Sequence, residues 1–167
     1  KMKVGPGLSS PDMGPLVSQE QFEKVKGYIK SGQSDGAKCA VGGGTVGDKG
    51  YFVEPTVLTN TNDKMDVIKE EIFGPVVTAE PFEDQDEIIA RSNNTTYGLA
   101  AAVWTSDVQK AIKTAEAFRA GTVWVNTYNI FDAALPFGGY KQSGWGREMG
   151  SEILEAYTQT KSVVIAK

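Results

Sequence analysis

The chain of 167 residues is 40% hydrophobic and 23% charged, which is the composition of a globular protein of ordinary size. Its net charge of −4 and its scattered lysines exclude nucleic acid as the main partner, because phosphate binding needs a basic patch. No apolar run approaches the roughly 20 residues of a membrane span, and the first residues lack the apolar block of a signal peptide. We therefore expect no membrane association and a cytoplasmic location, with the mitochondrial matrix as the alternative.

A single cysteine, Cys39, and the absence of histidine limit the chemistry that the chain can perform. Without histidine, Ser-His-Asp and Cys-His catalysis and the usual zinc sites are removed, so no metal site is predicted. One cysteine cannot form an internal disulfide, which is typical of a reducing compartment. Cys39 lies in a short apolar strand without a nearby base, and we interpret it as a buried structural residue rather than a nucleophile.

The first predicted helix covers residues 19–31. Ser18 and Gln21 form a capping-box signature, and apolar residues follow at helical spacing. A short strand at 37–41 is broken by three glycines at 42–44. Because β-prone residues rather than a helix follow the glycines, we interpret them as a hairpin turn and not as a phosphate cradle.

The remaining elements are predicted from the alternation of apolar and polar residues, from helix-capping residues and from glycine and proline at the ends of elements. Pro55 interrupts a strand at 51–58, which favours an edge position. The others are strands at 75–82, 99–104 and 122–125 and helices at 84–92, from Asp107 to 119, and at 151–156. The strand-helix-strand succession from 99 to 125 is long enough for a right-handed crossover, so a parallel sheet is expected.

Residues 70–75 (Glu-Glu-Ile-Phe-Gly-Pro) place two carboxylates beside an aromatic ring. One interpretation is a pocket wall, in which an acid grips hydroxyl groups and the ring packs against a flat ligand. The other is the end of a helix arriving from 63–69, closed by a Schellman-type turn, because residues before proline avoid the helical region.

Three aromatic residues, Tyr128, Phe131 and Phe137, follow the predicted buried strand at 122–125. Ligand crevices of parallel sheets lie at the carboxyl ends of their strands, so these rings can line an apolar tunnel or can simply pack within their own loop. Residues 138–147 are rich in glycine, which permits close backbone approach, but they match neither a Walker loop nor G-x-G-x-x-G. At the end, the β-prone segment 162–165 suggests pairing with another subunit.

Several long motifs resemble the C-terminal part of NAD(P)-dependent aldehyde dehydrogenases, and the resemblance covers nearly the whole chain. The matching stretches are residues 12–17, 70–75, 121–126, 135–144, 146–148 and 157–161. The resemblance implies an α/β fold of three layers with a largely parallel sheet. It also implies a partial catalytic domain over 1–157 and a C-terminal oligomerisation strand over 158–167, hence a homo-oligomer, dimer or tetramer, in the parent enzyme.

The resemblance also assigns roles by position. Glu71 is similar to the acid that binds the nicotinamide ribose hydroxyls, and Phe73 to the ring beside that end of the cofactor. The implied cofactor, NAD or NADP, is also approached by two helix residues, Gln21 and Lys24. Phe131 and Phe137 are the implied aromatic walls of the aldehyde tunnel, and Tyr128 and Asn129 lie nearer its implied mouth.

One departure from the family bears on activity. Family members oxidise aldehydes to carboxylic acids through a thiohemiacetal and a thioester on a cysteine, and a glutamate acts as general base. The catalytic cysteine and the glutamate both lie upstream of the matched region. Cys39 does not match the nucleophile's motif. We therefore expect no catalytic residue in this chain and no dehydrogenase activity from it alone. The alternative is an inactive fragment that acts only as an oligomerising module.

Overall fold

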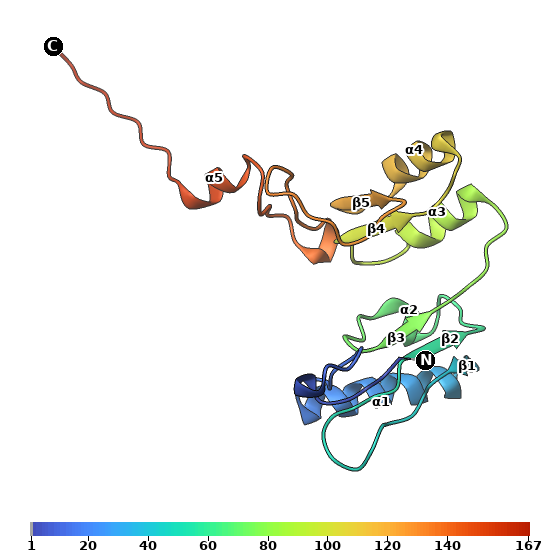
Figure 1. Cartoon of the computed structure of the whole chain (residues 1–167). Helices are drawn as coiled ribbons and strands as arrows, with labels where there is room; N and C mark the ends of the chain where they lie inside the picture. Colours follow the sequence, from blue (N-terminus) through green and yellow to red (C-terminus); the bar gives the residue numbers. More distant parts are fainter. Residues whose placement is uncertain (1) are drawn as a thin grey trace. The chain divides into compact units, whose positions relative to one another are not determined.

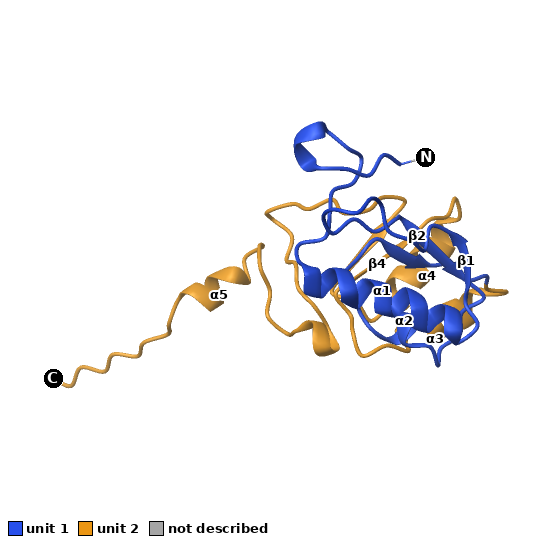
Figure 2. Cartoon of the chain, turned by 90° about the horizontal axis from the view of Figure 1, so that it is seen from below, with its two compact units in different colours: residues 1–81 blue, residues 82–167 orange. Residues whose placement is uncertain are grey.

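The computed structural model describes residues 2–167, which form two compact units that meet in the sequence between Pro81 and Phe82 (Figures 1 and 2). The elements of unit 1 are a 3-10 turn at Gly7–Ser9, α1 (Gln19–Ser34), β1 (Lys38–Val41), β2 (Thr56–Thr59), α2 (Asp66–Lys69) and β3 (Val76–Thr78). The elements of unit 2 are α3 (Gln85–Asn93), β4 (Ala100–Val103), α4 (Val108–Ala117), β5 (Thr122–Val125), a 3-10 turn at Lys141–Ser143 and α5 (Ile153–Tyr157).

Helix α1 begins where its cap predicts and runs three residues further than expected. The Ser18 hydroxyl oxygen accepts a hydrogen bond from the Gln21 N–H at 3.2 Å, which satisfies one of the unpaired donors of the first turn. The apolar side of the helix places Val25 and Ile29 in the core of unit 1. Burying a side chain of this size stabilises the fold by about 1.5–3 kcal/mol.

The sheet of unit 1 has the order β1-β2-β3, with β1 antiparallel and β3 parallel to β2. β1 and β2 pair antiparallel as the two strands of a hairpin, but the predicted turn at residues 42–44 is wrong, because the pairing continues past these glycines to a bridge between Thr45 and Val53. The predicted edge position is wrong, because β2 lies at the centre and Pro55 precedes its first residue. The ladder starts one residue later, where the Thr56 N–H donates to the Pro75 carbonyl at 2.8 Å. Proline therefore costs this strand no hydrogen bond.

In unit 2, β4 and β5 pair in parallel across the crossover helix α4, as predicted. The carboxylate of Asp107 caps α4 by accepting from two backbone N–H groups, those of Gln109 and Lys110. Ala111 and Thr114 are the buried residues of α4, whereas Val108 and Ile112 are exposed.

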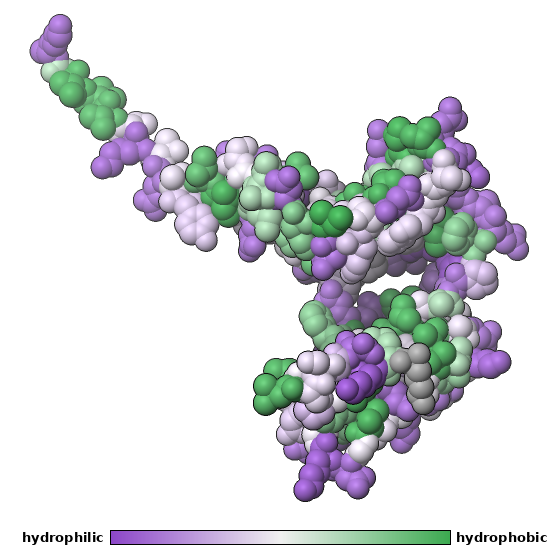
Figure 3. Space-filling model, viewed as in Figure 1, coloured by the Kyte–Doolittle hydropathy of each residue, from purple (hydrophilic) through white to green (hydrophobic). Residues whose placement is uncertain are grey.

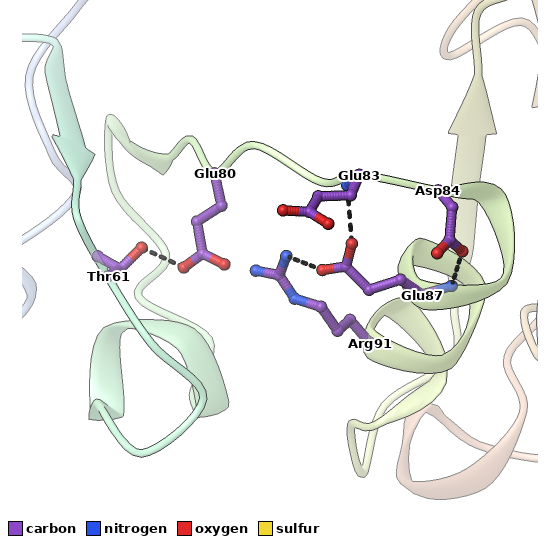
Figure 4. A network of polar contacts seen from close by, with 6 residues as sticks. All are labelled: Thr61, Glu80, Glu83, Asp84, Glu87 and Arg91. Carbon is purple, nitrogen blue, oxygen red and sulfur yellow. Dashed lines mark hydrogen bonds and ion pairs between the residues drawn. The ribbon is translucent and has the colours of Figure 1, made fainter.

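Helix α3 begins at a similar cap (Figure 4). The Asp84 carboxylate accepts from the Glu87 N–H at 2.8 Å, and the Glu87 side chain forms an ion pair with Arg91 one turn later, with 3.1 Å between Oε1 and Nη1. Unit 1 ends in another side-chain pair shown in Figure 4, in which the Thr61 hydroxyl donates to the Glu80 carboxylate. Local polar contacts therefore fix the chain just before and just after Pro81.

The predicted C-terminal strand is unpaired within the described residues 2–167. Residues 158–167 contain no strand, and a strand requires a neighbour for its backbone groups, which this segment lacks within residues 2–167. Val163, Val164 and Ile165 are exposed, and they form the apolar part of the tail in Figure 3. Pairing of this segment with another subunit stays a prediction. The predicted α/β class with parallel strand pairs is confirmed. Among residues 2–167, no helix is both long and apolar enough to cross a membrane.

Candidate functional site

The loop at residues 70–75 begins where α2 ends. Glu70 is already extended, with φ −110° and ψ 154°, so the predicted Schellman-type turn is wrong. The left-handed residue comes three positions later, at Phe73, whose φ is 52°. An aromatic residue in this region costs on the order of 1–3 kcal/mol, so its surroundings must hold it there.

Helix α1 supplies the contacts that hold this loop. The side-chain Nε2 of Gln21 donates to the Ile72 carbonyl at 2.9 Å and to the Phe73 carbonyl at 2.8 Å. The Ile72 side chain is buried in the core. A Cβ atom at Gly74 would lie 2.5 Å from Cγ2 of Val25, so only glycine allows the loop to approach the helix this closely. The bonds from Gln21, the burial of Ile72 and the close approach of Gly74 to Val25 therefore hold residues 72–74 against α1.

The two adjacent acids of this loop have different surroundings. Glu70 accepts a hydrogen bond from the Tyr28 hydroxyl at 2.5 Å. Glu71 is exposed, and within residues 2–167 its carboxylate makes no hydrogen bond or ion pair. The Phe73 ring next to it is 72% exposed. The structure thus presents one unpaired carboxylate and one aromatic ring to solvent on a rigid loop, which is the arrangement a ligand with hydroxyl groups and a flat ring requires.

Lys24 lies one turn after Gln21 on α1, beside a shallow groove of about 280 Å³. The lining residues are Lys24, Gly27, Tyr28, Ser31 and Asp66. The Lys24 ammonium lies 5.9 Å from the centre of the Tyr28 ring. The family resemblance assigned Gln21 and Lys24 to the cofactor but did not point to Tyr28, which joins this helix to the loop through Glu70. Its only sequence signal was a polar aromatic residue within an apolar stripe.

Unit 2 contains a second candidate region, a cavity of about 340 Å³ after β5. Its lining residues are Thr122, Val123, Trp124, Thr127, Ile130, Phe131, Asp132, Leu135, Pro136, Phe137 and Met149. Two of the four predicted tunnel residues, Phe131 and Phe137, are therefore in its wall, and their rings meet edge to face at 5.0 Å. The other two, Tyr128 and Asn129, are exposed residues of the same loop and do not line the cavity.

Trp124 connects these aromatic residues, and sequence reasoning counted it only as part of a buried strand. Its ring packs edge to face on Tyr128 at 5.3 Å and on Phe131 at 5.7 Å. Its indole N–H donates to the Ile130 carbonyl at 2.9 Å. A tryptophan immediately before a loop of aromatic residues was the available signal.

The glycine-rich segment after Phe137 closes the far end of this loop. Phe137 and Glu148 exchange two backbone hydrogen bonds of 2.7 Å each. A Cβ atom at Gly121, just before β5, would overlap the carbonyl oxygen of Gly138, so the two backbones are in direct contact. The Arg147 guanidinium donates to two backbone carbonyls of the same segment, those of Gly139 and Gly146.

Cys39 is half-buried rather than buried, since it lies at the outer strand of its sheet. Its thiol donates to the carbonyl oxygens of Val41 and Gly42, each at 3.2 Å. Its structural role stays a prediction. No cluster of three or more potential metal ligands occurs among residues 2–167.

Comparison with known proteins places the chain in a family. Residues 1–163 match the model of the aldehyde dehydrogenase family, and the chain belongs to that family. It is 56% identical over 163 residues to DhaS of Bacillus subtilis, a protein provisionally assigned to the aldehyde dehydrogenases; the match covers 97% of this chain and 33% of that protein. It is also 53% identical over 160 residues to aldehyde dehydrogenase 1A1 of Gallus gallus, covering 96% of this chain and 31% of the relative.

A solved structure supports the same assignment. The NAD+ complex of the aldehyde dehydrogenase from Bacillus cereus superposes with a TM-score of 0.94 at 52% identity, covering 98% of this chain and 33% of that one. The chain thus spans about a third of the length of the relatives that it matches.

Proposed function

We propose that this chain is the C-terminal part of the catalytic domain of a longer enzyme, the parent enzyme, which oxidises aldehydes to carboxylic acids with NAD+. The aromatic cavity beside Trp124 carries this proposal, because it provides an apolar wall for an aldehyde side chain within a family member. The NAD+ complex of the Bacillus cereus relative supports the cofactor. NADP stays open as the alternative cofactor.

Within that enzyme, the chain would supply one side of the nicotinamide site. The unpaired Glu71 carboxylate can accept hydrogen bonds from ribose hydroxyls, and the exposed Phe73 ring can pack against the cofactor. Bound NAD+ would supply the hydride acceptor. Gln21 holds the loop through both carbonyls, and Lys24 brings a positive charge to the same helix face. Each of the four predicted cofactor residues thus has a role that its surroundings permit.

The cavity also suggests a class of aldehyde. Its lining is mainly aromatic and aliphatic, and Asp132 is the only charged lining residue among the described residues. The negative charge of Asp132 in an otherwise apolar wall disfavours binding of an aldehyde that carries a carboxylate of its own. We therefore expect the parent enzyme to prefer aldehydes with apolar side chains over aldehydes that carry a carboxylate.

We infer that the nucleophilic cysteine and the general base belong to the parent's other residues. The Cys39 thiol donates to two backbone carbonyls, and no basic side chain of residues 2–167 is among its hydrogen-bond partners. Activation of a thiol requires such a base or a positive setting. Residues 1–157 would then be the partial catalytic domain, and residues 158–167 the oligomerisation segment of a dimer or tetramer.

The test compares the parent enzyme with this chain alone. Absorbance at the NADH band is followed with NAD+ and a panel of apolar and carboxylate-bearing aldehydes. We expect NADH from the parent, with a higher kcat/KM for the apolar members, and none from residues 1–167. Failure of the parent to oxidise any aldehyde contradicts the proposed function, and NADH formation by the isolated chain contradicts the missing-nucleophile inference.

The second candidate function is a catalytically inactive module that acts only by association. The exposed tail with Val163, Val164 and Ile165 favours it, because apolar β-prone segments associate with other strands. Light scattering of the chain with and without residues 158–167 separates the two outcomes. Association requires an oligomer that grows with concentration and disappears on truncation, and a monomer at all concentrations removes this candidate.

A further inference from the structure

We propose that Trp124 is a positioning residue, which fixes the loop at residues 126–137 and so determines which aldehyde side chains the cavity accepts. The inference rests on the proposed role of that cavity in aldehyde binding. Trp124 is not among the predicted tunnel residues, and we assign it an indirect effect on aldehyde binding, through the position of the loop.

The burial of Trp124 differs from that of the rings around it. The Trp124 side chain is 9% exposed and belongs to β5, where it pairs with Ala102 of β4. Its partners Tyr128 and Phe131 are exposed residues of the following loop. A ring held by a strand is therefore the fixed surface against which two loop rings are placed. Edge-to-face contacts of this kind stabilise the pair of rings beyond the burial of their apolar area.

Few hydrogen bonds hold the first half of this loop. The Asn126 side chain joins the loop start to Thr105, by accepting from its N–H at 2.8 Å and donating to its carbonyl at 2.9 Å. The next tie is the Trp124 indole N–H on the Ile130 carbonyl. Between these points Asn129 has a left-handed backbone, with φ 58°. The indole bond is thus the contact that closes the turn around Asn129.

The effect of Trp124 extends to the predicted tunnel wall through a chain of ring contacts. Trp124 meets Phe131 at 5.7 Å with perpendicular planes, and Phe131 meets Phe137 at 5.0 Å. Phe137 is fixed on its other side by its backbone bonds to Glu148. A displacement of the loop at Ile130 therefore moves Phe131, whereas Phe137 stays in place. The distance between the two rings changes, and with it the width of the cavity.

The experiment uses Trp124→Phe in the parent enzyme, since phenylalanine keeps an aromatic ring but removes the indole N–H. The ratio of kcat/KM between a bulky and a small apolar aldehyde should change roughly two- to tenfold, the effect of one hydrogen bond. KM for NAD+ should stay unchanged. Trp145→Phe is the matched control, because Trp145 is 94% exposed, and its aldehyde ratio should equal that of the parent.

A double-mutant cycle with Phe137→Ala tests the route of the effect. If Trp124 acts through the loop on the wall, Trp124→Phe should change the aldehyde ratio much less when Phe137 is already alanine. An unchanged ratio in Trp124→Phe, an equal change in Trp145→Phe, or full additivity in the cycle would each overturn the inference.

A second variant covers the case in which Trp124→Phe does not fold. Tyr128→Leu removes a ring that contacts Trp124 and leaves every lining side chain of the cavity in place, so it perturbs the loop without changing the wall itself. An unchanged ratio in that variant also overturns the inference. If Phe137→Ala alters the substrate profile while these variants do not, only the role of Trp124 fails; if Phe137→Ala has no effect either, the tunnel itself is disproved.

Discussion

The side-chain amide of Gln21 donates to the carbonyl oxygen of Phe73 at 2.8 Å, across 52 residues of sequence. The same nitrogen also donates to the Ile72 carbonyl. Gln21 was predicted as half of a capping box, in which its side chain would reach back to Ser18. It instead fixes the left-handed residue of the candidate cofactor loop.

Replacement of Gln21 should weaken both the fold and the cofactor site. Gln21→Ala removes two hydrogen bonds, each contributing about 0.5–1.5 kcal/mol, and lets Phe73 leave its strained backbone conformation. Gln21→Glu keeps the shape but places carboxylate oxygens against two carbonyls, so its effect should be larger. We expect a lower free energy of unfolding and a higher KM for NAD+ in the parent enzyme, measured by urea titration and steady-state kinetics. Gln19→Ala, at an exposed position of the same helix turn, is the control and should change neither quantity.

The adjacent acids of the loop should respond differently to the same substitution. Glu71→Gln in the parent enzyme should slow hydride transfer, because a charge-assisted hydrogen bond of about 1.5–3 kcal/mol to the ribose is weakened. Glu70→Gln should instead lower stability, through its bond to the Tyr28 hydroxyl, with little effect on that step. Stopped-flow measurement of the first turnover gives the hydride step for both. Equal rates in the parent and in Glu71→Gln would reject contact between Glu71 and the cofactor.

Truncation of Phe137 should change substrate choice more than stability. Phe137→Ala opens the wall at the point where the Phe131 ring meets it, so bulky aldehydes should gain in kcat/KM relative to small ones. The control is Phe82→Ala, an exposed phenylalanine of the same unit outside the cavity. A competition assay with paired aldehydes measures the ratio. An identical profile in both variants would count against a tunnel wall.

The backbone contact between Gly121 and Gly138 should tolerate no side chain. In Gly121→Ala the new methyl group overlaps a carbonyl oxygen, and overpacking of this kind costs typically 1–3 kcal/mol or more. Gly14→Ala is the matched control, because a Cβ there meets nothing within 4 Å. Thermal unfolding should show a clear drop in Tm for Gly121→Ala only. A Tm equal to that of the control would mean that the two segments separate easily.

Local patterns were enough to predict most of the fold. The caps at Ser18 and Asp107 and the crossover to β5 follow from hydrogen-bonding rules that act over a few residues. The errors have a different origin. The central position of β2 depends on its pairing with β3, twenty residues later, which no pattern around Pro55 encodes.

In the candidate site, too, some features follow from the sequence and others depend on the packing of distant residues. Residue types and the family resemblance pointed to Glu71, Phe73 and the aromatic loop. The supports of those residues could not be predicted, because Gln21, Tyr28 and Trp124 act through contacts whose geometry depends on the packed chain. The bonds of Gln21 and Tyr28 span 52 and 42 residues and leave no local periodicity, whereas the Trp124 bond spans six residues and depends on how the loop folds back.

The contact of Gly121 with Gly138 has a consequence for how substrate preference can change in this part of the molecule. At Gly121 and Gly138 the stretch before the aromatic loop and the segment after it touch through main-chain atoms, so both anchors of the loop form one rigid frame. A segment clamped at both ends can vary only in its middle. Residues 127–136 are then the adjustable part of the cavity wall, and exchange of that stretch alone between two enzymes should transfer aldehyde preference without disturbing the frame.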